Sequence, residues 1–251
     1  MPPDTTLVVP CYNEGARLDT AEFRRFAGAS PGTSFCFVDD GSRDDTLVVL
    51  ERMCGECPGL GRVLSLPGNR GKAEAVRQGL LAALAGGAPY VGFWDADLAT
   101  PLDELPRFRA VFAERPDTEI VLGSRVRLLG RQIERRGLRH YLGRVFATGA
   151  SLTLGLPVYD TQCGAKLFRA TAALRAVLAE PFLTRWVFDV EILARYLDGP
   201  GDRVQAARRI YELPLLRWTD VPGSKVRPWD FVRSGLELVR IRNVYVRGRR
   251  G

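Results

Sequence analysis

Short apolar runs rich in β-branched residues alternate with helical patterns along this chain, and this alternation constrains the fold more than any other feature. The expected strands cover residues 5–10, 35–38, 62–66, 90–94, 119–122 and 210–216. The expected helices cover residues 45–54, 72–85 and 103–114. Strands that alternate with helices form mostly parallel sheets covered on both faces. We therefore predict an α/β fold with a mostly parallel central sheet flanked by helices.

A polar motif follows each of the first five expected strands, in the order PCYNEG, DDGSRDDT, GNRGK, DADLATP and GSR. Parallel sheets bind their ligands outside the carboxyl ends of the strands. Since all five motifs stand at such ends, we expect them to meet on one rim of the sheet. The pattern predicts a binding cleft at this rim.

Asp95 and Asp97 directly follow the fourth expected strand. Residues two apart in an extended chain project to the same side, so both carboxylates can face one cation. Hard oxygen ligands suit Mg²⁺ or Mn²⁺, which commonly bridge carboxylates to substrate phosphates. An isolated Asp-x-Asp is a weak signal, and its ordinary explanation is a solvated turn that caps a helix. Its place beside four other polar strand ends favours the metal site.

The second strand ends in Asp39 and Asp40, whose carboxylates can accept hydrogen bonds from a base N–H or a ribose hydroxyl. Asp40, Ser42 or Asp44 could instead cap the next helix, and both roles can hold for different residues. Lys72 opens the following helix, where a lysine and a helix N-terminus both favour phosphate. The loop lacks the Walker A pattern and no GxGxxG follows the first strand, which disfavours P-loop and dinucleotide folds.

The composition limits the class of protein further. A length of 251 residues suits one large α/β domain. No run of about 18 apolar residues exists and the N-terminus lacks a signal-peptide pattern, so we expect no transmembrane helix and a cytoplasmic location. Five cysteines form no disulfide or zinc framework, and the single histidine, His140, excludes multi-histidine metal sites.

The formal net charge is +7, and it is unevenly distributed. Residues 224–251 contain eight Lys or Arg against two acidic residues, and residues 125–144 contain seven arginines against one glutamate. Clustered arginine indicates an anionic partner, such as a phosphate, a nucleic acid or an acidic membrane surface. A solvated charged face is the alternative for either cluster.

The motifs in this order resemble the family 2 glycosyltransferases, and among them the dolichyl- or polyprenyl-phosphate β-glucosyltransferases. The resemblance rests on VVPCYNEGARL, FVDDGSRDDT, NRGKAEAVRQG, DADLATP, LGSR, YDTQCGAKLFR, RWVFDVEIL and PGSKVRPWDFV, which span residues 8–232. Each motif alone is modest, whereas the ordered set is specific. The resemblance implies a GT-A fold, a UDP-sugar donor with glucose first, Mg²⁺ or Mn²⁺ as cofactor, and inversion at the anomeric carbon. GDP-mannose is the alternative donor.

The resemblance also implies roles for individual residues. The residues that would bind the nucleotide sugar are Pro10, Tyr12, Glu14, Asp39, Asp40, Asp95, Ala96, Asp97 and Lys225. Ser42 and Lys72 are added to this set because of their positions in the second and third loops. The metal would lie on Asp95 and Asp97, and Arg125 and Lys225 would meet phosphate groups. The sequence departs from the family where Ala73 replaces a usual glycine and Ala165 a usual aromatic residue, so the sugar or the acceptor could differ.

Two kinds of acceptor make different demands on the protein. A polyprenyl phosphate, with a second pKa near roughly 6, is largely dianionic at neutral pH and needs no protein base. Arginines would instead position it, and the candidates are Arg125, Arg136 and Arg139. A soluble hydroxyl acceptor would need a general base, for which Asp189 and Glu191 are candidates unless they only stabilise a helix N-terminus. The catalytic candidates are therefore Asp97, Arg125, Asp189 and Glu191.

We divide the chain into a glycosyltransferase domain at residues 1–222 and a basic amphipathic segment at residues 223–251. In that segment Trp229, Val232, Leu236 and Val239 share one helical face. This face could lie on an anionic membrane, peripherally on the cytoplasmic side, or it could pack on the domain. Many relatives carry a membrane span that this sequence lacks, which weakens the inference of a lipid acceptor more than that of the donor.

Two other classes of protein share some of these sequence features. A basic module that binds polyanions or membranes without catalysis would leave DDGS, DAD and FDVE without a purpose, and we expect no nucleic-acid partner. A metal-dependent nucleotidyltransferase also uses paired carboxylates and basic residues. The released product separates it from a glycosyltransferase, because it releases pyrophosphate instead of UDP.

Overall fold

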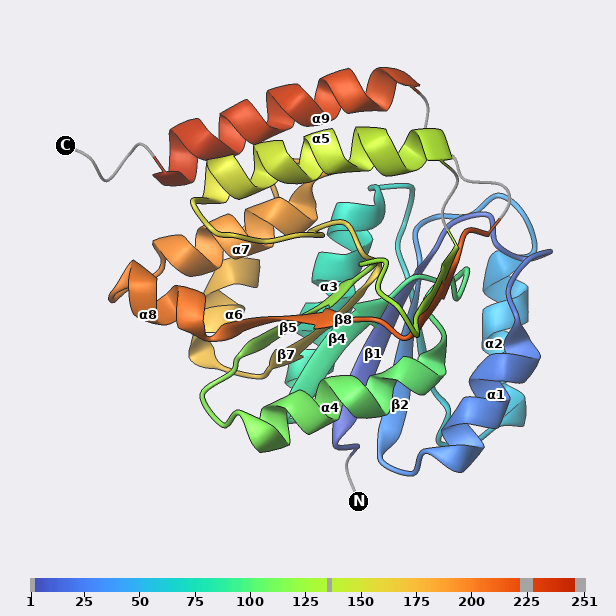
Figure 1. Cartoon of the computed structure of the whole chain (residues 1–251). Helices are drawn as coiled ribbons and strands as arrows, with labels where there is room; N and C mark the ends of the chain where they lie inside the picture. The colour runs from blue at the N-terminus through green and yellow to red at the C-terminus, as the bar shows by residue number, and fades with distance from the viewer. Residues whose placement is uncertain (1–2, 135–136, 222–227, 247–251) are drawn as a thin grey trace.

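The computed structural model describes residues 3–134, 137–221 and 228–246. Its centre is a seven-stranded sheet in the order β3-β2-β1-β4-β7-β5-β8 (Figure 1). All neighbouring strands are parallel except β7, which runs antiparallel to both β4 and β5. The strands are β1 (Thr5–Cys11), β2 (Thr33–Asp39), β3 (Gly61–Ser65), β4 (Tyr90–Trp94), β5 (Ile120–Ser124), β7 (Ala165–Arg169) and β8 (Ile210–Pro214).

Helices cover both faces of this sheet, as Figure 1 shows. One face carries α1 (Thr20–Ala29), α2 (Thr46–Glu56) and α4 (Leu105–Glu114). The other carries α3 (Lys72–Ala85), α5 (Gly137–Leu154), α6 (Ala172–Leu178), α7 (Phe188–Asp198) and α9 (Pro228–Ile241). Shorter elements are η1 (Leu102–Glu104), α8 (Arg203–Arg208), η2 (Arg242–Val246) and a second parallel sheet of β6 (Gln132–Glu134) and β9 (Arg217–Thr219).

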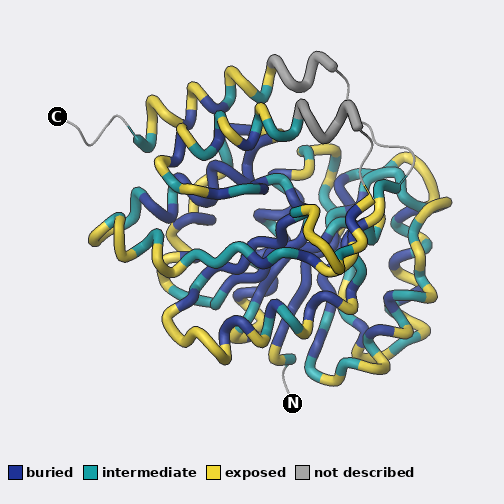
Figure 2. The backbone as a smooth tube through the Cα atoms, viewed as in Figure 1, coloured by how far each residue is buried: buried dark blue, intermediate teal, exposed yellow. Residues whose placement is uncertain are grey.

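Strand β1 shows why the two layers form. Its side chains alternate between the faces, so Val8 belongs to the buried cluster that contains α3 and α7, while Leu7 and Val9 belong to the cluster that contains α1 and α4. All three side chains are fully buried. Figure 2 shows that the buried residues concentrate in the central strands, as expected for a sheet covered on both faces.

The predicted α/β architecture is confirmed, and the six expected strands and three expected helices all form within a few residues of their predicted limits. Pro106 lies in the first turn of α4, as its missing N–H requires. Strand β7 was missed. It is short, its second residue is the fully buried Lys166, and a lysine there breaks the apolar pattern by which buried strands are recognised.

The C-terminal helix α9 packs against α5 and α7. It uses Leu238 and Ile241 for this, and both are buried. By contrast Leu236 is 68% exposed and Val239 is 56% exposed. The alternative that this helical face packs on the domain is therefore wrong for Leu236 and Val239. A second apolar face, with Leu238 and Ile241, packs on the domain instead.

Candidate active site

The loops that follow β1 and β2 are tied together by hydrogen bonds. Asn13 N–H donates to Ser42 Oγ over 3.0 Å, and Arg43 N–H donates to Asn13 Oδ1 over 2.9 Å. The N–H of Glu14 donates to Thr46 Oγ1 over 2.8 Å. Pro10, Tyr12 and Glu14 thereby lie beside Asp39, Asp40 and Ser42, as expected for strands paired in parallel. Ser42 and Asp44 serve this loop structure, since Asp44 Oδ1 accepts the Thr46 N–H at the start of α2.

Asp40 connects the second loop to the third. Its Oδ1 accepts the N–H of Arg70 over 2.7 Å, and its Oδ2 accepts the N–H of Gly71 over 2.8 Å. Burial raises the pKa of Asp40, while these two N–H groups act in the opposite direction. Gly71 has φ +91°, and Asp40 thus fixes the turn from which α3 starts. Its neighbour Asp39 is also buried and accepts the Ser42 N–H.

Asp95, Ala96 and Asp97 follow β4 at the centre of the same rim. Lys72 Nζ, from the first residue of α3, lies 2.5 Å from Asp95 Oδ1. Burial lowers the pKa of Lys72, but the charges of Asp95, Asp189 and Asp97 outweigh it and the net shift is upward. Asp97 is exposed on the rim, yet its pKa is raised, because the surrounding protein partly desolvates the carboxylate and because Asp95 carries a like charge nearby. Two carboxylates so close favour a cation between them and the substrate.

Gly164, just before β7, allows Asp95 to lie where it does. The N–H of Asp95 donates to Gly164 O over 2.9 Å. A Cβ atom on Gly164 would lie 2.0 Å from Asp95 Oδ2 and 2.2 Å from its Cγ. Glycine is therefore required for close approach, and this requirement explains the glycine of the DTQCG motif. Ala165, which departs from the family pattern, is fully buried in β7 opposite Trp94 and does not reach the cleft.

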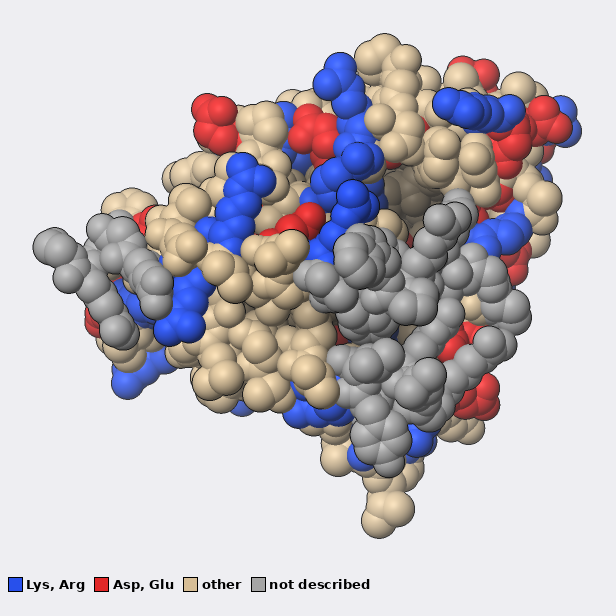
Figure 3. Space-filling model, turned by 90° about the horizontal axis from the view of Figure 1, so that it is seen from above, with Lys and Arg blue, Asp and Glu red and all other residues tan. Residues whose placement is uncertain are grey.

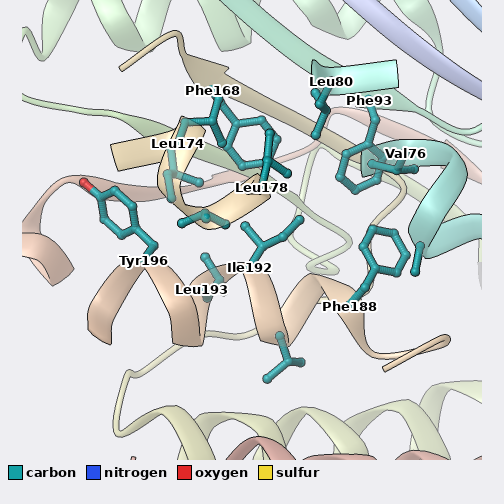
Figure 4. Packing of buried hydrophobic residues seen from close by; sticks show 14 of the residues in the cluster. Val76, Leu80, Phe93, Phe168, Leu174, Leu178, Phe188, Ile192, Leu193 and Tyr196 are labelled. Atoms are coloured by element: carbon teal, nitrogen blue, oxygen red, sulfur yellow. The ribbon is translucent and has the colours of Figure 1, made fainter. Parts of the chain in front are cut away.

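Asp189, at the start of α7, projects toward the rim. It accepts a short hydrogen bond from Lys166 Nζ, which also donates to Cys163 O over 2.7 Å. Burial raises the pKa of Asp189, while Lys166 and Lys72 act in the opposite direction. The ammonium lies 5.0 Å from the ring centre of Phe93, which packs beside Phe188 in the cluster of Figure 4. Asp189 is thus held within electrostatic reach of Lys72.

Glu191 turns away from the rim. Residues two apart on a helix do not share a face, so Asp189 and Glu191 diverge. The Glu191 carboxylate is fully buried and accepts hydrogen bonds from the N–H groups of Leu183 and Thr184, over 2.9 Å each, and from Arg195 and Tyr245. The candidate base Glu191 is corrected to a structural residue, because its oxygens are occupied in fixing the loop before α7.

Arg125, at the end of β5, forms a bidentate pair with Asp160. Its Nε lies 2.6 Å and its second guanidinium nitrogen 2.8 Å from the Asp160 oxygens, and the guanidinium stacks on Trp218. Asp160 raises the pKa of Arg125 against the effect of burial. Asp160 compensates the positive charge of Arg125, so a phosphate would share this guanidinium with Asp160. Lys225, Arg136 and the side chain of Arg139 lie outside the described residues.

The donor set fits a divalent cation. In the described part of the chain, no group of three or more Asp, Glu, His or Cys residues could hold a metal by itself. Asp95 Oδ1 is buried and, apart from its ion pair with Lys72, accepts no hydrogen bond from a described residue. Two carboxylates completed by substrate oxygens are the usual arrangement for Mg²⁺ with a phosphate ligand. Asp95 and Asp97 would hold the ion in this way.

The family model "Glycosyl transferase family 2" matches residues 6–175, which cover both acidic motifs and the strand with Lys166. The chain belongs to this family. The glycosyltransferase is 31% identical over 259 residues to a dolichyl-phosphate β-glucosyltransferase of Dictyostelium discoideum, covering 97% of this chain and 75% of that protein. It is 31% identical to that of Homo sapiens, covering 97% and 76%, respectively. A dolichol-phosphate mannosyltransferase of Saccharomyces cerevisiae matches only 48% of the chain, at 29% identity.

Solved structures support the GT-A fold of this enzyme. A glucosyl-3-phosphoglycerate synthase of Mycobacterium tuberculosis, solved with Mn²⁺, UDP and glucosyl-3-phosphoglycerate, aligns with a TM-score of 0.66 at 19% identity. The alignment covers 95% of this chain and 78% of that one. The same synthase was also solved with Mg²⁺ and UDP. The predicted family and fold are confirmed.

Sequence reasoning missed several residues that shape this site. Gly164, Lys166 and Asp160 occur in the YDTQCGAKLFR motif, but only the fold brings them to Asp95, Asp189 and Arg125, respectively. A lysine inside an otherwise apolar run was the available signal. A buried lysine requires a nearby carboxylate, and the acidic residues of FDVE were the candidates to supply it.

Proposed function

We propose that this glycosyltransferase moves glucose from UDP-glucose to a polyprenyl or dolichyl phosphate, with inversion at the anomeric carbon. The observation that carries the proposal is the match to dolichyl-phosphate β-glucosyltransferases over 94–97% of the chain, at about 30% identity. The geometry supports it, because two carboxylates, a lysine and a buried Lys–Asp pair surround one point of the rim.

The donor half of the reaction follows from this rim. A divalent ion on Asp95 and Asp97 would supply positive charge to the leaving diphosphate. Lys72 would add a second positive charge beside Asp95, at the N-terminus of α3. Glu14, Asp39 and the loop around Ser42 would enclose the base and ribose. Asp40 would contribute indirectly, by holding Gly71 and therefore Lys72 in place.

The acceptor half needs no protein base if the nucleophile is a phosphate dianion. Arg125 would orient that phosphate with the part of its guanidinium that Asp160 leaves available. A soluble hydroxyl acceptor would require a base, and after the correction of Glu191 the remaining candidate is Asp189. Its raised pKa suits a proton acceptor, although its hydrogen bond to Lys166 limits its freedom.

We further propose that α5 and α9 rest on an anionic membrane surface, which brings the site to a lipid acceptor. No helix in the described ranges is long and apolar enough to cross a membrane. Exposed apolar side chains lie along both helices, namely Val145 and Leu152 on α5 and Leu236 and Val239 on α9. On the face of the molecule seen in Figure 3, Lys and Arg side chains lie among uncharged residues. Arg203 and Arg242 line a cavity of about 410 Å³ beside Leu152.

A transfer assay tests the enzymatic proposal. Wild-type protein with Mg²⁺ or Mn²⁺ should transfer radiolabelled glucose from UDP-glucose to a polyprenyl phosphate and release UDP. Inactivity with every prenyl chain length would remove the lipid acceptor. Transfer to the hydroxyl group of a soluble acceptor would then support the alternative acceptor. Transfer only from GDP-mannose would replace the donor, and release of pyrophosphate would indicate a nucleotidyltransferase.

Vesicle sedimentation tests the membrane proposal. Wild-type protein should sediment with vesicles that contain phosphatidylserine and remain in solution with pure phosphatidylcholine. Val239→Asp should abolish sedimentation, because the charge cannot enter the apolar boundary. Val48→Asp, at a position of similar exposure on α2, is the matched control and should sediment like wild type. Equal sedimentation of the two variants would contradict the assignment of this face.

A further inference from the structure

Arg185 lies at the edge of the active-site rim, and no described acidic residue pairs with its side chain. Its guanidinium lies beside Gly71, with Nε 3.1 Å from the position of a Cβ atom on that glycine. Its positive charge lowers the pKa of Asp40, against the larger effect of burial. No described carboxylate forms an ion pair with Arg185, which is exposed. A guanidinium in this position is available to an anionic ligand.

Arg185 lies in the loop between α6 and α7, and its place along the rim indicates which ligand it would meet. Asp40 and Gly71 follow β2 and β3, on one side of the central carboxylates after β4. Arg125 follows β5, on the other side. Lys72, next to Gly71, points at Asp95. Arg185 therefore belongs to the half of the rim that would hold the nucleotide, whereas Arg125 belongs to the other half.

Glu237 of α9 holds the backbone of Arg185 in place. Its carboxylate accepts three consecutive N–H groups, from Arg185 over 3.3 Å and from Trp186 and Val187 over 3.2 Å each. The same helix contacts this loop a second time, because Arg240 donates to Leu183 O over 3.1 Å. A carboxylate that accepts several backbone N–H groups fixes the conformation of the segment that carries them.

We infer that Arg185 binds the diphosphate of the sugar nucleotide and that Glu237 is the positioning residue that holds Arg185 in reach of it. The inference rests on the proposed function, since it assumes a nucleoside diphosphate donor. The Glu237 carboxylate would thereby connect α9 to the donor site. A guanidinium matches two phosphate oxygens in geometry as well as charge, which an ammonium does not.

Calorimetric titration with UDP and Mn²⁺ tests this inference on the full chain. Arg185→Ala should raise the Kd of UDP about tenfold or more, because a charge-assisted hydrogen bond is lost. Arg185→Lys should recover only part of the loss, since the bidentate geometry is absent. Arg233→Ala removes an exposed arginine from α9 and is the control, with an unchanged Kd expected.

Glu237→Ala should raise the Kd of UDP several-fold, whereas Glu237→Gln keeps one accepting oxygen and should restore most of the affinity. In the Arg185→Ala background, Glu237→Ala should have no further effect on the Kd. A role of Glu237 that is only structural would instead weaken UDP binding equally in both backgrounds. Melting temperatures measured in parallel identify any variant that fails to fold.

The outcomes separate the two proposals. If wild type binds UDP and Arg185→Ala binds it equally well, the inference is wrong and the proposed function stands. If Arg185→Ala changes only the KM for the acceptor, Arg185 belongs to the acceptor phosphate and the inference is equally wrong. If wild type binds no UDP at all, the proposed donor fails and the inference fails with it.

Discussion

The contact between Gly164 and Asp95 makes Gly164→Ala an informative substitution. The new methyl group would lie 2.0 Å from Asp95 Oδ2, 2.2 Å from Cγ and 2.8 Å from Oδ1. Non-bonded heavy atoms require about 3.5 Å, so the carboxylate must move by more than about 1 Å. The φ of Gly164 is not in the left-handed region, and an alanine adds no backbone strain there. The whole effect is therefore steric.

This displacement has two measurable consequences. It separates Asp95 from Lys72 Nζ, now 2.5 Å away, and it misplaces a proposed metal ligand. A misplacement of 1 Å in a catalytic arrangement costs about 10²-fold in rate. We expect glucosyl transfer to fall by about that factor and the Kd of UDP with Mn²⁺ to rise. Overpacking in a close-packed region should also lower the free energy of unfolding by about 1–3 kcal/mol.

The control for Gly164→Ala is Gly55→Ala. Gly55 lies on the exposed side of α2, where an added Cβ atom meets nothing within 4 Å. Alanine is the better helix former by about 0.5–1 kcal/mol, so this variant should be as active as wild type and slightly more stable.

A double-mutant cycle separates the steric effect from general misfolding. Asp95→Ala removes the side chain that clashes, so Gly164→Ala should cost little stability in that background. Chemical denaturation gives the unfolding free energies of the four proteins. Full activity in Gly164→Ala, or an equal stability loss with and without Asp95, would refute the argument.

Three further predictions follow from the charged groups. Asp97→Asn should abolish metal-dependent transfer yet raise the melting temperature of the metal-free protein at neutral pH. The pKa of Asp97 is higher in the folded than in the unfolded protein, so its contribution to stability is present below the unfolded pKa and is lost as pH rises and the carboxylate ionises. Scanning calorimetry at pH 4 and pH 7 should therefore show that Asp97→Asn stabilises the protein at pH 7 only. Lys166→Met should lower the free energy of unfolding by about 3–5 kcal/mol, because it leaves the Asp189 carboxylate buried without its ion pair, and urea titration measures this loss. Glu191→Gln should destabilise the fold by a similar amount while kcat per folded molecule stays unchanged, whereas a pH-dependent loss of kcat would return Glu191 to the chemistry.

The fold was predictable because the relevant signals are local. The period of the apolar residues indicates whether a segment forms a strand or a helix. Parallel pairing of the strands then brings the ends of β1, β2 and β4 together. Asp39, Asp95 and Asp97 could be assigned to one rim on that basis alone. The antiparallel β7 could not, since its pattern is interrupted by Lys166.

The pairing of charges was decided only by the tertiary structure. Lys166 meets Asp189, Arg125 meets Asp160, and Glu237 meets the backbone before α7, over separations of 23, 35 and about 50 residues along the chain. No sequence period encodes such partners, because each pair depends on how α5, α7 and α9 stack on one face of the sheet. The sequence determined which chemical groups reach the rim. Packing determined which partners these groups have, because a buried charge must be paired, and a carboxylate whose two oxygens are both engaged within the protein, such as that of Glu191, is removed from the chemistry.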